Sequence, residues 1–263
     1  MAEPLFEARD IVVRYNRHVA LDGLSITVQP GERVALLGAN GSGKSTLLRV
    51  LDALIFPESG TVSIDGEPLD EQRFEDAAFT FAFRKRVGLV FQNPDVQLFN
   101  PTVFDEVAFG PLQLRWPANE IRERVADALE MMDIAALRDR SPHQLSGGEK
   151  KRVALASVMI LDPEVLLLDE PTAALDPKSQ TQIVDLLRSW GGGRKTVITA
   201  THDLDCLEDI ADRCAVFDRG KVVAEGGPLE VLHDVALLKS ARLISAHHHT
   251  HGNGNGVHPH IHG

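Results

Sequence analysis

The chain has 263 residues, of which 43% are hydrophobic and 25% charged, and this length suits one large α/β domain or two small ones. Its formal net charge of −11 disfavours general binding to the phosphate backbone of nucleic acids, because like charges repel. We expect neither a signal peptide nor a membrane span, since the first four residues lack a basic region and no apolar stretch approaches roughly 18 residues.

The first part of the chain shows the pattern of β-strands. Residues 11–15 are rich in β-branched side chains, and residues 24–28 alternate between apolar and polar side chains. Residues 34–37 form a further apolar strand after a Pro-Gly turn. Residues 61–68 repeat the strand pattern around an Asp-Gly turn signal. We therefore expect an antiparallel layer that flanks the core of the domain.

A glycine-rich loop follows residues 34–37 and precedes residues 47–51, which can continue as a helix. Its sequence is Gly38-Ala39-Asn40-Gly41-Ser42-Gly43-Lys44-Ser45-Thr46. A G-x-x-x-x-G-K-[ST] loop between a strand and a helix predicts a phosphate-binding site, because glycines let backbone N–H groups approach phosphate oxygens. The helix N-terminus adds unpaired donors. Lys44 would supply a charge for the β- and γ-phosphates and Ser45 a hydroxyl ligand for Mg²⁺, so we expect a nucleoside triphosphate.

The pattern changes after a short buried strand at residues 87–91, which ends at Gln92. The uncharged amide of Gln92 could reach both Mg²⁺ and a water molecule. Residues 94 to about 160 lack strand patterns, and we interpret them as a helical subdomain inserted into the sheet. A helix that opens near residue 117 has an apolar stripe that we expect to face the core: Ile121, Val125, Leu129 and Met132.

Leu145-Ser146-Gly147-Gly148-Glu149 opens an apolar helix within this subdomain. Ser146 is a favourable N-cap, and the two glycines leave backbone donors exposed at the positive end of the helix. The segment therefore predicts a second anion site, with an ordinary capped helix start as the alternative. Two anion sites on one chain have a natural use if two chains face each other and each triphosphate is clamped from both sides.

An apolar strand at residues 165–168 ends in two carboxylates, Asp169 and Glu170. In phosphate-loop proteins Mg²⁺ and the attacking water lie at this position, so we expect Asp169 to hold the metal and Glu170 to polarise the water. The strand at residues 196–199 leads to His202, whose neutral imidazole could bond the γ-phosphate and orient the water. Taken singly, these groups could equally be solvated carboxylates and a packed histidine, but the phosphate loop favours the site.

The remaining elements are a helix from residue 177 to 190, a hairpin over residues 215–224 and a final helix from residue 228 to about 243. Cys206 and Cys214 are the only cysteines. We expect both to be reduced and without a metal or disulfide role, which fits the cytoplasm.

In their order, these motifs resemble those of the nucleotide-binding subunits of ATP-binding cassette transporters, from residue 5 to about 240. The matching elements are the Walker A loop Gly38–Ser45, the Q-loop Gln92, the signature Leu145–Glu149, the Walker B strand Val165–Glu170, the D-loop Ala174–Asp176, the switch His202 and Tyr15, which matches the aromatic that stacks on adenine. Glu149 stands where Gln is more common and Ala173 where Ser or Gly is common, but both leave the phosphate-binding groups intact.

The resemblance implies an α/β fold with a RecA-like P-loop NTPase core, an N-terminal antiparallel β layer and an inserted α-helical subdomain. It implies Mg²⁺-dependent ATP hydrolysis, with Ser45, Gln92 and Asp169 toward Mg²⁺. It further implies a head-to-tail dimer with itself or a second such ATPase, in which Ser146, Gly147 and Gly148 contact ATP in trans. Nucleic acid is not an expected partner.

Residues 90–99, 101–103 and 105–111 are similar to energy-coupling-factor transporter ATPases, most of all the cobalt/nickel type. Family members dock on the coupling helix of a membrane subunit just after Gln92. An apolar patch suits this role, with a local core plug as the alternative, and comprises Val96, Leu98 and Phe99. The resemblance implies a peripheral subunit on the cytoplasmic face of a prokaryotic membrane that energises cobalt or nickel import. A vitamin importer, a soluble ATPase acting on nucleic acid or ribosomes, and a metal-storage protein are the alternatives.

Residues 245–263 form a tail rich in histidine, glycine and asparagine, which we expect to be disordered. Its histidines are His247, His248, His249, His251, His258, His260 and His262. Imidazoles on a flexible tether can bind Ni²⁺, Co²⁺, Zn²⁺ or Cu²⁺. We interpret the segment as a native tail that buffers or senses the transported Ni²⁺ or Co²⁺; an expression tag is the alternative, although tags are usually unbroken runs.

Overall fold

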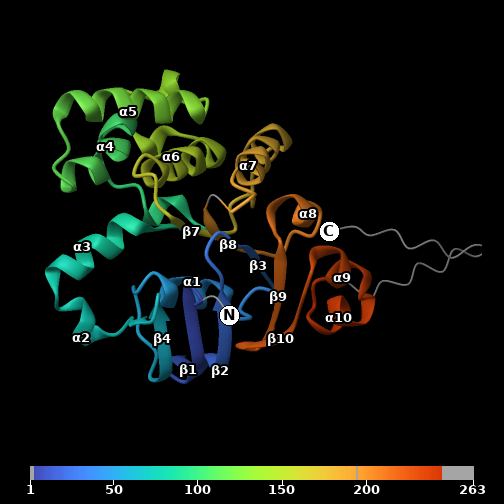
Figure 1. The fold of residues 1–263 in the computed structure, drawn as a ribbon. Helices are drawn as coiled ribbons and strands as arrows, with labels where there is room; N and C mark the ends of the chain where they lie inside the picture. The colour runs from blue at the N-terminus through green and yellow to red at the C-terminus, as the bar shows by residue number, and fades with distance from the viewer. Residues whose placement is uncertain (1–2, 194, 245–263) are drawn as a thin grey trace, which may run out of the picture.

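The computed structural model describes residues 3–193 and 195–244, so the predictions for the histidine-rich tail lie outside the described residues. Two β-sheets and a group of helices form the layers of the molecule (Figure 1). The fold is the predicted α/β class. No helix of the described residues is both long and apolar enough to cross a bilayer.

The predicted antiparallel layer is a four-stranded sheet. In the order of the sheet, its strands are β2 (His18–Val28), β1 (Phe6–Tyr15), β4 (Ser59–Ile64) and β5 (Glu67–Pro68). Asp65 and Gly66, which connect the last two strands, have φ angles of 48° and 75°. Two positive φ angles in succession are what a type I′ hairpin turn requires, as the Asp-Gly signal predicts.

The second sheet has six strands and forms the centre of the molecule. In the order of the sheet, they are β10 (Lys221–Gly226), β9 (Arg213–Asp218), β3 (Arg33–Leu37), β8 (Thr196–Thr201), β7 (Val165–Asp169) and β6 (Val87–Val90). All neighbours are parallel except β10 and β9. Every residue of β7 and β8 is buried, as strands covered on both faces require.

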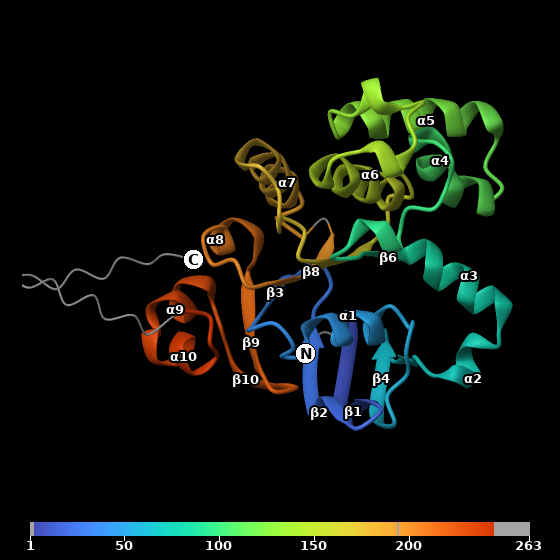
Figure 2. The same cartoon turned by 180° about the vertical axis from the view of Figure 1, so that it is seen from behind.

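Helix α1 (Lys44–Leu51) lies between the two sheets, whereas α4 (Val103–Gln113), α5 (Ala118–Met131) and α6 (Gly147–Met159) lie on the other side of the six-stranded sheet (Figure 2). The chain therefore has two hydrophobic cores. One core lies around α1 and includes Leu47, Leu48 and Leu51, and the other lies between the large sheet and the helices. The phosphate loop, which precedes α1, is thus anchored by packing on both sheets.

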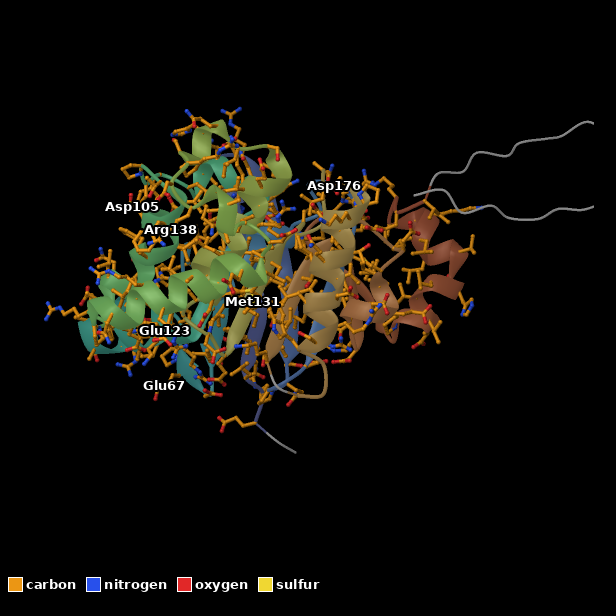
Figure 3. All side chains as sticks on the ribbon, turned by 90° about the horizontal axis from the view of Figure 1, so that it is seen from above. Glu67, Asp105, Glu123, Met131, Arg138 and Asp176 are labelled. Carbon is orange, nitrogen blue, oxygen red and sulfur yellow. The ribbon has the colours of Figure 1, made fainter. Side chains whose placement is uncertain are left out.

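Residues 94–160, all of them described, contain helices and no strand. The elements are η1 (Pro94–Val96), α4 (Val103–Gln113), α5 (Ala118–Met131), η2 (Ala135–Leu137), η3 (Pro142–Gln144) and α6 (Gly147–Met159). The stripe predicted on α5 is buried, including Met132 just beyond the helix. Asp105 and Arg138 lie on neighbouring segments of this layer (Figure 3), where Phe104 N donates to Arg138 O at 2.9 Å.

Two helices lie where no element was predicted: α2 (Glu71–Phe74) and α3 (Ala77–Arg86). Aromatic residues alternate along α3, a spacing that resembles a strand more than a helix. The structure shows a helix because Asp76 caps it, accepting from the N–H groups of Ala78 and Phe79. Phe83 is buried and packs edge-on against Phe74, with ring centroids 5.1 Å apart.

The predicted helix from residue 177 is α7 (Pro177–Ser189), and a short α8 (Leu207–Ile210) follows β8. The single final helix predicted from residue 228 to about 243 is wrong. The structure has two short helices, α9 (Pro228–His233) and α10 (Val235–Ser240). Asp234 separates them with a non-helical ψ of 78°, and its side chain caps the second helix by accepting from Leu237 N at 2.9 Å.

Candidate functional site

The predicted site residues follow strands that end at one edge of the six-stranded sheet. Leu37 of β3 lies beside Thr201 of β8, and Ala200 of β8 lies beside Asp169 of β7. The phosphate loop after Leu37, the carboxylates at the end of β7 and His202 after β8 therefore meet at this edge. Ligands of open α/β sheets bind at the carboxyl ends of the strands, and this is that end.

A pocket of about 330 Å³ opens at this edge. Its lining consists of Tyr15, His18, Ala20, Asn40, Gly41, Ser42, Gly43, Lys44, Ser45, Thr46, Gln92 and Glu170. The structure thus brings the predicted adenine-stacking Tyr15, most of the phosphate loop, Gln92 and Glu170 together. Two other predicted residues are outside this lining but contact it. Asp169 shares a hydrogen bond with Ser45, and His202 shares one with Glu170.

The loop has the backbone that its glycines predict. Gly43 has a φ of 112°, and a Cβ there would lie 2.7 Å from the carbonyl oxygen of Ala20. A Cβ on Gly38 would lie 2.5 Å from the carbonyl oxygen of Phe217. Gly43 also caps α1 without a side-chain acceptor, so the first N–H groups of the helix stay available to an anion.

Four buried charged groups lie in the pocket lining or in contact with it: Lys44 and Glu170 line it, while Asp169 contacts Ser45 and Lys151 contacts the backbone of Gln92. Two ammonium groups and two carboxylates offset one another, which makes their burial tolerable. Lys44 Nζ donates to Gly38 O at 2.6 Å. Burial lowers the pKa of Lys44 and the two carboxylates oppose this effect, while burial raises the pKa of Asp169 and the Ser45 hydroxyl opposes it.

The oxygen atoms near the end of β7 suit Mg²⁺. Ser45 Oγ donates to Asp169 Oδ1 at 2.9 Å, and Gln92 lines the same pocket. Hydroxyl, carboxylate and amide oxygens are hard ligands of the kind that Mg²⁺ takes together with substrate phosphates. The residues present therefore fit the predicted metal.

Glu170 points away from Asp169, as expected of two successive residues at a strand end. Its φ of 48° is uncommon for a residue with a side chain, and its carboxylate is buried. Glu170 Oε1 lies 2.8 Å from His202 Nδ1, whose ring is about half exposed. An uncommon backbone conformation held in a packed structure is typical of functional sites.

The predicted second anion site lies elsewhere on the chain, outside the lining of the pocket. Ser146 caps α6, accepting from Glu149 N at 3.3 Å, and Glu149 Oε2 accepts from Ser146 N at 2.7 Å. The hydrogen bond from Ser146 N lowers the pKa of the Glu149 carboxyl. Ser146 and Gly147 are exposed, so one chain by itself leaves this helix end facing solvent.

The D-loop leads into α7, where Asp176 is the N-cap (Figure 3). Asp176 Oδ2 accepts from Ser179 Oγ at 2.7 Å. Arg152 of α6 donates to the same Ser179 oxygen at 2.6 Å. The signature helix and the D-loop are therefore linked by side chains.

The predicted apolar patch after Gln92 is partly wrong. Val96 and Phe99 are 67% and 64% exposed, but Leu98 is 4% exposed and belongs to the helical core. Phe109 of α4 joins the patch instead, with its ring edge-on to that of Phe99 at a centroid distance of 5.0 Å. The chain after Gln92 turns in η1, which points Leu98 inward and leaves its neighbours outside.

Two buried charged groups, Glu106 and Lys151, were not among the predicted site residues. Glu106 of α4 fixes the loop by accepting from the N–H groups of Phe99 and Asn100 at 2.9 and 2.7 Å. Lys151 of α6 is 2% exposed. A signal for Lys151 exists in the sequence, since it stands three residues before Ala154 and four before Leu155 on the apolar face of its helix.

Comparisons with known proteins agree with this geometry. A family model described as ABC transporter matches residues 21–173. The chain is 57% identical to the nickel import ATP-binding protein NikO of Rhodobacter capsulatus, over 92% of this chain and 96% of that protein. These matches confirm the relationship to ATP-binding cassette ATPases of the cobalt/nickel type.

Solved structures show the same fold. CbiO1 from Clostridium perfringens, described as part of the ABC transporter complex cbiONQ, is 36% identical with a TM-score of 0.75 and covers 92% of this chain and 96% of its own. A dimeric ATP-binding cassette in a post-hydrolysis state, bound to ADP and Pi, is 29% identical with a TM-score of 0.76 and covers 85% of this chain and 98% of its own. The chain therefore belongs to the ABC transporter family and is one of its ATPases.

Proposed function

We propose that this ATPase powers a membrane importer for nickel or cobalt. The observation that carries the proposal is the convergence of Lys44, Glu170 and Gln92 on one pocket at the carboxyl edge of the sheet. The chain is similar to a nickel import protein over 92% of its own length and 96% of that protein, and this similarity supports nickel or cobalt as the cargo.

The phosphate loop and Tyr15 bind ATP in this proposal. The N–H groups of the loop and of the first turn of α1 receive the phosphates, and Lys44 transfers its hydrogen bond from Gly38 O to a phosphate oxygen. Tyr15, which is 39% exposed at the pocket rim, stacks on adenine. Ser45, Asp169 and Gln92 face Mg²⁺, which when bound neutralises charge on the β- and γ-phosphates.

Glu170 and His202 direct the attack of water on the γ-phosphorus. Glu170 aligns the water and accepts its proton, which needs a carboxylate within hydrogen-bond reach of that water. His202 holds Glu170 through the 2.8 Å contact of their side chains and is exposed enough to reach the γ-phosphate. The bond between the β,γ-bridging oxygen and the γ-phosphorus breaks, giving ADP and phosphate.

Two copies, or this chain and a second ATPase, bind ATP head to tail between them. Ser146, Gly147 and Gly148 of one chain contact the γ-phosphate held by Lys44 of the other. Support comes from the exposure of this helix end and from the dimeric cassette with the same fold. Hydrolysis removes the bridging phosphate and reopens the pair.

The surface of Val96, Phe99 and Phe109 receives the membrane subunit. These side chains form an exposed apolar patch beside the loop that leaves the site at Gln92, so docking there couples to the site. In this arrangement the chain is peripheral, on the cytoplasmic face of the membrane.

The histidine-rich tail buffers the transported ion, a proposal that rests on sequence alone. Calorimetric titration with Ni²⁺ compares the intact chain with a version ending near Ser245. We expect the intact chain alone to bind several ions; equal binding by both chains would remove this role.

Uptake of radioactive nickel and cobalt tests the proposed cargo. Cells that express the chain with its membrane partners are compared with cells that carry Lys44→Ala. We expect uptake of at least one of the two ions to require intact Lys44. Uptake of neither ion, with Lys44-dependent uptake of a vitamin instead, would show that the cargo is wrong while the ATPase is right.

A further inference from the structure

Lys151 is a buried cation at the junction of three functional segments. It belongs to the signature helix α6 and is 2% exposed. Its Nζ donates to the carbonyl oxygens of Phe91, Gln92 and Asp169 at 3.2, 3.0 and 3.3 Å. An ammonium group has three N–H donors, so these three acceptors satisfy it completely.

The position of the Lys151 ammonium group explains what its hydrogen bonds do. Strands β6 and β7 pair up to Val90 and Leu168, after which the β6 chain leaves the sheet at Gln92. Lys151 donates hydrogen bonds to the backbone just beyond the last residue pair of these two strands, where the pairing of β6 with β7 has ended. Its hydrogen bonds therefore hold the ends of β6 and β7 together where the backbone hydrogen bonds of the sheet have stopped. This is also where the Gln92 and Asp169 side chains enter the site.

The charge of Lys151 also belongs to this site. No salt bridge within the described residues includes Lys151; burial lowers the pKa of its ammonium group to about 8, and the nearby carboxylates of Asp169 and Glu170 oppose this effect without direct contact. Burying an ammonium group without a direct ion pair is costly. An apolar residue would leave the three carbonyl oxygens without this donor, so the cost of burial points to a requirement for the hydrogen bonds of Lys151.

Two further contacts connect residues 91–97, which include Gln92 of the Q-loop, to helix α6. Gln97 accepts from Phe91 N at 3.2 Å and donates to Ala154 O of α6 at 2.9 Å. Lys150 of α6 contacts Asp95 at 2.6 Å. With Lys151, these contacts fasten residues 91–97 to the signature helix.

We propose that Lys151 is a positioning residue for hydrolysis: from the signature helix it sets the spacing between Gln92 and Asp169 and makes that spacing depend on the position of α6. The inference rests on the proposed assignment of Gln92 and Asp169 to Mg²⁺. It gives the signature helix a second task besides the contact with ATP in trans, because a shift of α6 would move Gln92 relative to the end of β7.

The test compares Lys151→Met, which removes donors and charge, with Lys151→Gln, which keeps two donors; both side chains are one atom shorter than lysine, so they differ from each other in polarity and not in length. Lys195→Met is the control: the Lys195 side chain is 17% exposed and pairs with Asp162, and like Lys151 it donates to a carbonyl oxygen, that of Pro163 at 2.6 Å, away from the pocket lining. The readouts are the Mg²⁺ concentration for half-maximal ATPase activity, ATP affinity without Mg²⁺, and hydrogen exchange of residues 91–97 in the nucleotide-free full-length chain.

We expect Lys151→Met to raise the Mg²⁺ requirement about 10–100-fold, the usual effect of losing a partner that orients metal ligands. Lys151→Gln should fall between Lys151→Met and the unsubstituted chain, and ATP affinity without Mg²⁺ should change little in both. Exchange should quicken in residues 91–97 and not in α1. Lys195→Met should change none of these.

An unchanged Mg²⁺ requirement and unchanged exchange in either folded variant would overturn the proposal. If Lys151→Met fails to fold, Lys151→Gln decides the outcome, since its amide keeps two N–H donors for the three carbonyl oxygens. Absence of Mg²⁺-dependent hydrolysis in the unsubstituted chain would instead contradict the proposed function, so the two failures are distinguishable.

Discussion

Glu170 and His202 show how single residues at the strand ends acquire roles. The side chains of these two residues are 2.8 Å apart only because β7 and β8 are neighbours in the sheet. Sequence motifs predict both residues but not their contact. The left-handed backbone of Glu170 turns its carboxylate from Asp169 toward His202.

Glu170→Gln is expected to bind ATP normally and to lose hydrolysis about 10²–10⁴-fold, because an amide cannot accept the proton of the attacking water. Steady-state phosphate release and nucleotide affinity measure the two effects. Near-normal turnover would show that another group is the base.

A second prediction at the scale of single residues concerns Asp52 and the pH dependence of the free energy of unfolding. Asp52 caps the C-terminal end of α1 and is 6% exposed, with Arg84 at 3.3 Å. Burial raises the pKa of the Asp52 carboxyl to about 7, and Arg84 opposes this effect. Because folding raises the pKa, the contribution of Asp52 to stability is complete below its ordinary pKa of 3.8 and is lost as the pH rises through about 7.

Asp52→Asn should therefore remove a pH-dependent part of the free energy of unfolding. Relative to Asp52→Asn, the unsubstituted chain should lose stability from about pH 4 to about pH 7 and show no further change above that. Each unit of pKa difference corresponds to about 1.4 kcal/mol. Urea unfolding of both chains across this range measures the difference, and a constant difference would contradict the assignment.

At the scale of elements, the strands and the helix cap at Ser146 were predictable, whereas the caps at Asp76 and Asp234 and the connections between helices were not. The apolar strands before Gly38 and Asp169 and the capping box at Ser146 are local signals, and the structure has all three. The break at Asp234 depends on one side chain that prefers to cap a new turn. The burial of Leu98 depends on packing between α4 and α6, which no local pattern reports.

The patch beside α4 gives a prediction at this scale. Phe99→Ser is expected to weaken co-purification with the membrane subunit, because it removes an exposed ring from the proposed docking surface. Its thermal unfolding midpoint should change little, since the ring is 64% exposed. Leu229→Ser on α9, where Leu229 is 54% exposed, is the matched control and should leave co-purification intact. Equal loss in both variants would contradict the assignment of the surface.

In the proposed function, the whole molecule joins ATP binding at one edge of the sheet to a docking surface on the helical layer. Motifs predicted most residues of the pocket, though not His18 and Ala20, because each motif has its own chemistry, as Lys44 and Glu170 illustrate. They did not reveal Lys151 and Glu106, whose importance comes from backbone groups that only the folded chain brings to them. Sequence motifs therefore identify the groups expected to bind phosphate better than they identify the buried side chains that link one segment of the chain to another.

Mixing two inactive variants tests the shared ATP site most directly. Lys44→Ala removes the phosphate-loop charge. Gly147→Asp places a carboxylate at the signature helix, where a Cβ meets no atom within 4 Å of the same chain, so the fold tolerates it. Each variant alone is expected to be inactive, because every site in its pair is damaged.

A mixed pair has one intact site, made from Lys44 of the Gly147→Asp chain and Gly147 of the Lys44→Ala chain. The account predicts that mixing restores ATP hydrolysis, measured as phosphate release against each variant alone. Gly147→Asp chains that hydrolyse ATP normally by themselves, or a mixture no more active than its parts, would contradict it.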